Sequence, residues 1–119
     1  MVVLAIAVIP TIEFSDGDGD VVSRETTSSM ESLWIDMENT DTAARRFTVR
    51  VAAPGSDAPV NGVRVLPDAM PELDGGENRR VLIVFQAMQP GELREAEVCY
   101  APQIRPQEAT CTHFAIKRL

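Results

Sequence analysis

The sequence is short of several residue types, and each shortage excludes a class of protein. There is one histidine among 119 residues, and the GxSxG, HExxH and glycine-rich phosphate motifs are all missing, so we name no catalytic residue and expect a non-enzymatic protein. No apolar run is long enough to cross a membrane. Lysine and arginine total 11 against 18 acidic residues, and the net charge of -7 opposes nucleic acid as a partner because phosphates would be repelled.

What is present is typical of an all-β protein. The length and the 45% hydrophobic content fit one domain spanning residues 1–119. Residues 81–85 form an unbroken apolar run rich in β-branched side chains, which predicts a strand buried on both faces. Further on, Ala96, Val98 and Tyr100 alternate with polar positions, which predicts a strand with one face in a core.

The same patterns predict the other strands. They are an opening strand over residues 2–14 interrupted at Pro10, and strands over residues 30–38, 46–53, 60–66 and 110–118. Residues 21–29 are polar enough for a connection or a short edge strand, and residues 67–78 are expected to form a loop. Residues 2–9 also resemble a fragment of an export signal, but they are few and no Lys or Arg precedes them, which favours a first strand. We predict a seven-stranded antiparallel immunoglobulin-like β-sandwich.

Two strands show which side chains would face the core. In residues 46–53, Phe47, Val49 and Val51 share the predicted inward face. In residues 30–38, an apolar set and Trp34 lie on opposite faces, and which of the two faces is inward stays open. The apolar set is Leu33, Ile35 and Met37.

The two cysteines are spaced to suit the two arms of one hairpin. A disulfide between Cys99 and Cys111 is favoured over two buried thiols, and it implies an oxidising compartment. That hairpin pairs residues symmetrically about Arg105, which sets Glu97 opposite His113 as an expected ion pair. If the thiols are reduced, Cys99, Cys111 and His113 offer an alternative zinc or copper site. The alternative is less favoured because the compact CxxC spacing of strong zinc sites is absent.

Asp16, Asp18 and Asp20 have the alternate spacing of carboxylates in a calcium loop. However, Val21 stands where the tight turn needs glycine, and Thr27 stands where the bidentate glutamate belongs. A solvated hairpin loop is therefore favoured, and we expect no cofactor.

Several segments together carry a resemblance to a known family. They are residues 6–14, 32–40, 47–51, 65–67, 80–85, 90–92 and 95–100. In these segments the chain resembles, at superfamily level, the amino-terminal immunoglobulin-like domain of the periplasmic pilus-assembly chaperones. The resemblance implies that the last strand is offered to an incomplete pilin subunit, and that basic residues hold the terminal carboxylate of that subunit.

Carried onto this chain, the resemblance gives a partner-binding strand with Thr112, Phe114 and Ile116 as the alternating set. Lys117 is the candidate basic anchor on that strand. The opening strand has Thr11 and Ile12 where an arginine would be expected in the family, and the chain stops where a second domain would begin. We therefore expect a free-standing relative instead of a dedicated two-domain chaperone.

The expected function is that of a chaperone-like binding or scaffolding module, periplasmic or secreted. It would pair an exposed strand edge with a protein partner or with its own copies, and the opening and closing strands are the candidate edges. Two alternatives stay open. One is a structural or accessory subunit of an envelope complex or extracellular assembly, and the other is a metal-binding module at Cys99, Cys111 and His113.

Overall fold

The computed structural model describes residues 20–119. The opening strand predicted over residues 2–14 lies outside the described residues, and so does the calcium-loop hypothesis, which requires Asp16 and Asp18. Within residues 20–119 there is no helix of the length and apolarity that a membrane span requires. The strands are β1 (Asp20–Thr26), β2 (Glu31–Glu38), β3 (Arg45–Ala52), β4 (Val63–Leu66), β5 (Glu72–Leu73), β6 (Asn78–Phe85), β7 (Leu93–Pro102) and β8 (Thr110–Arg118).

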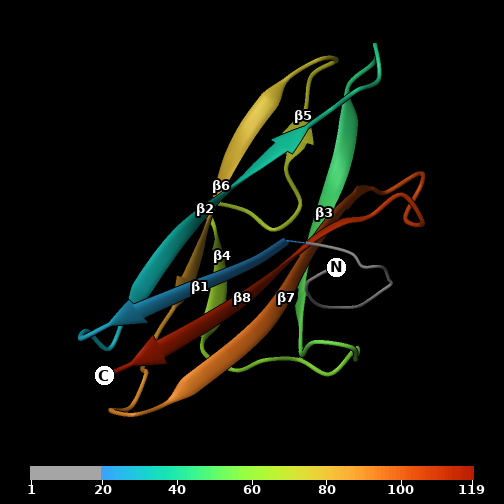
Figure 1. Ribbon diagram of the computed structural model, residues 1–119. Coiled ribbons are helices and arrows are strands. Elements are labelled where there is room, and N and C mark those ends of the chain that lie inside the picture. Colours follow the sequence, from blue (N-terminus) through green and yellow to red (C-terminus); the bar gives the residue numbers. More distant parts are fainter. Residues whose placement is uncertain (1–19) are drawn as a thin grey trace, which may run out of the picture.

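These strands form two sheets that pack face to face (Figure 1). The larger sheet has the order β1-β8-β7-β3-β5, and the smaller has the order β2-β6-β4. The predicted all-β immunoglobulin-like sandwich is confirmed. The strand list differs from the expected seven antiparallel strands because residues 20–26 pair with β8 in parallel, and because residues 72–73, expected to be loop, pair with β3.

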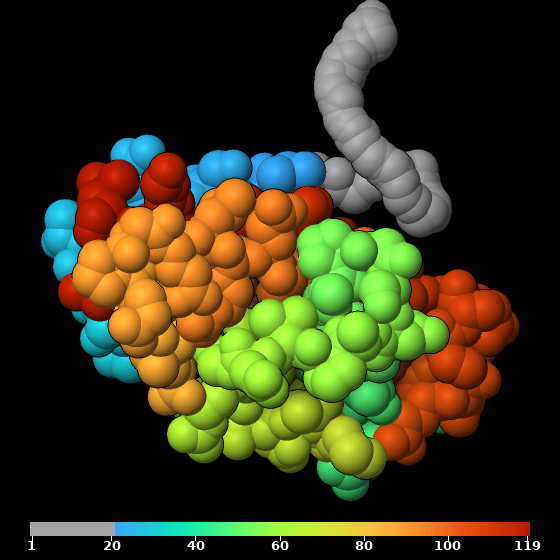
Figure 2. Space-filling model, turned by 90° about the horizontal axis from the view of Figure 1, so that it is seen from below, coloured from blue at the N-terminus to red at the C-terminus, as the bar shows by residue number. Residues whose placement is uncertain are grey.

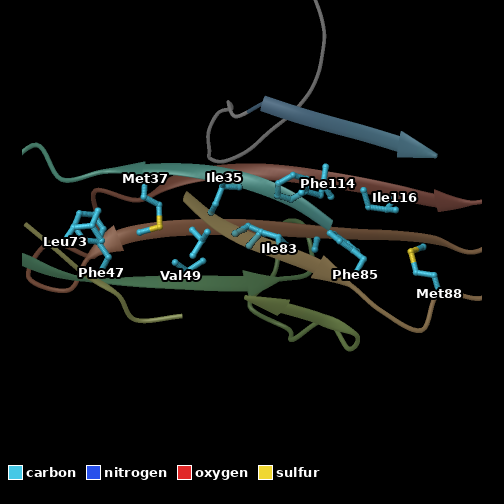
Figure 3. Packing of buried hydrophobic residues seen from close by; sticks show 14 residues of the cluster. Ile35, Met37, Phe47, Val49, Leu73, Ile83, Phe85, Met88, Phe114 and Ile116 are labelled. Carbon is cyan, nitrogen blue, oxygen red and sulfur yellow. The ribbon is translucent and has the colours of Figure 1, made fainter. Parts of the chain in front are cut away.

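The core lies between the two sheets and is built from the alternating residues of their inner faces (Figure 3). Trp34 is 56% exposed, which answers the open question about β2 in favour of the apolar set. Phe85 and Phe114 meet across the core with ring centroids 6.2 Å apart in an edge-on arrangement, a favourable geometry for aromatic pairs. The main contributors are Leu33, Ile35, Met37, Phe47, Val49, Val81, Ile83, Phe85, Ala96, Val98, Phe114 and Ile116.

A buried asparagine fixes the end of the sandwich where β5 lies. Asn39 is the one buried polar residue among residues 20–119, and its Nδ2 donates hydrogen bonds to the carbonyl oxygens of Ala43, Leu73 and Asp74. Its Oδ1 accepts a hydrogen bond from the backbone N–H of Asp41. Because every polar atom of the side chain is paired, its burial carries little penalty, and it holds the fully buried Leu73 in the core.

Candidate functional site

The pairing of β7 with β8 has the predicted register. Cys99 lies opposite Cys111 and Ala96 lies opposite Phe114, as expected for a hairpin that is symmetric about Arg105. The side chains of β8 therefore alternate between the core and the outer face of the sheet.

The closing strand is not an edge of the sheet, and this corrects the expectation that it is exposed along one side. β8 lies between β7 and β1, so its main chain has a neighbour on both sides. Phe114 and Ile116 are almost completely buried, Thr112 is half-buried, and Lys117 is exposed on the outer face. The predicted partner-binding side chains alternate as expected, but the position beside them is already occupied within the chain.

The occupant of that position is β1, the outermost strand of the larger sheet. β1 pairs in parallel with β8 over seven residues, from Asp20 opposite Thr112 to Thr26 opposite Arg118. Val22 is its one hydrophobic side chain that packs against the core, while Val21 is 55% exposed. Figure 2 shows β1 in blue as a narrow strip along the rim of the molecule, and Figure 3 labels no core residue on it.

β1 is therefore held mainly by main-chain hydrogen bonds, and no other strand within residues 20–119 pairs with its outer side. Sequence reasoning left this segment undecided, because one inward valine among polar residues gives almost no periodic signal. The pair of adjacent valines, Val21 and Val22, was the only hint of a strand.

The other sheet edges are less open to a partner. β5 has two residues and β4 has four, which is too short for an extended ladder. β2 has eight residues, but Glu31, Asp36 and Glu38 place three negative charges along it, a device that discourages edge-to-edge pairing. β1 carries Asp20, Arg24 and Glu25, so charges of both signs lie along it.

The cysteines form a disulfide on the outer face of the larger sheet. Cys99 and Cys111 are bonded, with Cα atoms 4.0 Å apart, so in this structure neither sulfur is available as a thiolate ligand. His113 does not pair with Glu97, which corrects the expected ion pair. The Nε2 atom of His113 lies 2.8 Å from Oε1 of Glu95, the diagonal neighbour in the ladder, a position that is within reach of aromatic and long side chains.

A charged cluster ties the loop between β7 and β8 to the loop between β2 and β3. Arg105 donates hydrogen bonds to Asp41 and to Glu108, and Arg45 also donates to Asp41. The hydrogen bonds from Arg105 and then Arg45 lower the pKa of Asp41 below its ordinary value of 3.8. The same contact with Asp41, followed by that with Glu108, raises the pKa of Arg105. The cluster gives the hairpin loop a fixed position.

A shallow surface cavity of ≈ 260 Å³ lies under this hairpin loop, beside Cys99. Arg50 and Tyr100 are its ionisable lining residues apart from the bonded cysteine. Among the described residues this cavity therefore offers no carboxylate or imidazole for acid–base chemistry.

No family model and no curated protein matches this chain. Solved structures do match. The E. coli chaperone DraB is 18% identical with a TM-score of 0.60, and the match covers 84% of this chain and 52% of that one. A complex of the Salmonella enterica SafA pilin with the SafB chaperone matches with 14% identity and a TM-score of 0.63, again over 84% of this chain and 52% of the other.

A PapD-like domain of human CEP192 is 15% identical with a TM-score of 0.57, over 86% of this chain and 82% of that one. This chain thus spans about half the length of the chaperones it matches, 52% in both cases. The superfamily-level resemblance to pilus-assembly chaperones is confirmed as a likeness of fold. The fold also forms 23% of a family 123 glycoside hydrolase from Clostridium perfringens, which is 6% identical with a TM-score of 0.63, so fold alone does not decide between binding and catalysis.

Proposed function

We propose that this chain is a non-enzymatic, chaperone-like module that binds an extended polypeptide by main-chain pairing along the rim formed by β1 and β8. The observation that carries the proposal is the position of β1, a seven-residue strand that, among residues 20–119, is paired on one side only. A free strand edge gives affinity through main-chain hydrogen bonds, while side chains at alternate positions give selectivity. The partner is another protein or a second copy of this chain.

A polypeptide has two ways to pair at this rim. It can add to the outer side of β1, which needs no rearrangement. Alternatively, β1 moves away and the polypeptide takes its place on β8, where Thr112, Phe114 and Ile116 form the alternating set and Lys117 is the basic anchor. The second way is supported by the small apolar contact of β1, since Val22 is its one hydrophobic side chain that packs against the core.

Export to the periplasm or secretion belongs to the same proposal. The Cys99–Cys111 disulfide supports it, because such bonds persist in oxidising compartments and are rare where thiols are kept reduced. The likeness in fold to the chaperones DraB and SafB supports a binding role in such a compartment.

The test uses peptides of ten to twelve residues, selected from a displayed random library on the immobilised full chain. Each selected peptide is then made in two N-methylated forms, with methyl groups on even or on odd residues. On a strand edge only alternate N–H groups face the protein, so one form should lose about tenfold in affinity per blocked hydrogen bond while the other binds as before. Equal effects of both forms, or no effect of either, would contradict main-chain pairing.

A covalent lock distinguishes the two ways of pairing. Ser23 of β1 lies opposite Ala115 of β8, so the S23C/A115C variant can bond β1 to its neighbour, and S23C alone is the matched control. Peptide binding that survives the lock places the partner on the outer side of β1. Binding that is lost in the locked variant and kept in the control places the partner on β8.

A structural or accessory subunit is the second candidate, and Trp34 favours it. This side chain is 56% exposed on the outer face of the smaller sheet, and the Arg80 guanidinium lies 5.6 Å from the centroid of its ring. Arg80 is in turn bonded to Asp36 at 3.1 Å. A tryptophan that an arginine holds in place is a suitable anchor for a side-chain interface. If the selected peptides lose affinity for W34A and tolerate both methylated forms, this candidate replaces the first.

A further inference from the structure

Four side chains with metal-ligating atoms form a square on the outer face of the β7–β8 hairpin. Cys99 lies opposite Cys111, and in the next row Glu97 lies opposite His113. Residues two apart on a strand share a face, so all four project from the side of the sheet away from the core. Carboxylate oxygen and sulfur atoms of Glu97, Cys99 and Cys111 already lie within 4.8 Å of one another.

This set matches the ligands that Zn²⁺ prefers. Two thiolates, an imidazole and a carboxylate give the nitrogen, sulfur and oxygen donors of tetrahedral zinc sites. Two features keep such a site closed in the structure. The sulfurs are bonded to each other, and the His113 ring is turned toward Glu95.

Both features are reversible. The contact between His113 and Glu95 joins side chains that are 31% and 43% exposed, and a polar contact so open to water is weak enough for the ring to turn toward Cys111. A dithiol reductant gives two electrons and two protons to the disulfide, which opens to two thiols while the reductant becomes a disulfide. Binding of Zn²⁺ then releases the two thiol protons and forms two metal–sulfur bonds.

We propose that reduction of the Cys99–Cys111 bond opens a site for a borderline-soft divalent cation such as Zn²⁺. Cys99, Cys111 and His113 are the ligands on this assignment, and Glu97 completes the tetrahedron. The site uses side chains on the outer face of the larger sheet, where His113 lies opposite Val21 of β1, whereas the proposed strand pairing uses main-chain groups. In an oxidising compartment the disulfide keeps it shut, so the cation binds only under reducing conditions.

The test is a Co²⁺ titration of the full chain, reduced with a phosphine that is then removed under anaerobic conditions. Oxidised protein of identical sequence is the matched control. The reduced chain should bind one Co²⁺ per chain, with thiolate-to-metal charge-transfer absorption and the visible spectrum of tetrahedral cobalt, and Zn²⁺ should bleach both. The oxidised chain should show neither band.

Variants show whether His113 and Glu97 take part in metal binding or whether the two thiols bind the metal alone. H113N and E97Q should each weaken Co²⁺ binding by more than about tenfold, whereas E95Q should bind at least as tightly as the original because it frees the His113 ring. Circular dichroism of each reduced variant checks that the sheets remain folded. The proposal is overturned if reduced and oxidised proteins bind Co²⁺ alike, if one ion bridges two chains, or if H113N and E97Q bind as tightly as the unchanged chain.

Discussion

Replacing Asn39 by alanine should lower the free energy of unfolding by about 2–4 kcal/mol. The side chain makes four hydrogen bonds, and each contributes about 0.5–1.5 kcal/mol net. Only the bond to the Leu73 carbonyl is fully buried, and the other three are partly buried, so water can satisfy some of the groups that the alanine leaves unpaired. The expected loss of unfolding free energy therefore lies in the lower half of the range obtained by adding the contributions of the four hydrogen bonds.

Urea unfolding followed by far-ultraviolet circular dichroism measures this loss. Thr40→Ala is the matched control, because Thr40 is the exposed neighbour of Asn39 and its replacement should change stability by less than about 0.5 kcal/mol. In N39A, amides near β5 should also exchange with solvent faster than those of β7. If N39A unfolds at the same urea concentration as T40A, the claim that the side-chain hydrogen bonds of Asn39 stabilise this end of the sandwich is refuted.

Three further predictions concern other parts of the chain. Replacing both Cys99 and Cys111 by serine should cost about 3 kcal/mol in urea unfolding, because the bond closes a loop with a sequence separation of 12. The lowered pKa of Asp41 makes its folded-state contribution complete above its ordinary value of 3.8 and lost as the pH falls through the folded value, so D41N should show a flatter decline of stability in acid titrations. Gly75→Ala places a Cβ atom against the backbone of Thr42, so calorimetry should show a lower melting temperature.

The strands with strict alternation were predictable because their faces separate cleanly into core and solvent. Phe47 and Val49, like Ala96 and Val98, are buried as the period-2 pattern requires. The pairing of β7 with β8 was predictable for another reason, since placing Cys99 opposite Cys111 fixes the register of every other pair in that hairpin.

The sequence did not predict β5 or decide the state of β1, because both strands depend on tertiary contacts that leave no periodic pattern in the sequence. Leu73 lies in a two-residue strand that exists because Asn39, distant in sequence, accepts and donates the bonds that fix the neighbouring loops. β1 has one inward side chain, so its strand is determined by the available edge of β8 and not by its own composition. In the candidate site, the sequence predicted that Phe114 and Ile116 share one face of β8. It did not predict that β1 lies beside β8.

The most direct test of strand pairing at the β1–β8 rim is residue-resolved amide hydrogen exchange of the full chain, with and without a selected peptide. The proposed function predicts slower exchange at alternate amides of residues 20–26, because only alternate N–H groups on a strand face a new neighbour. If the peptide instead replaces β1 on β8, residues 20–26 should exchange faster because they lose their pairing with β8. Slower exchange confined to β2 and β6 around Trp34, with no change at the rim, would contradict the proposal.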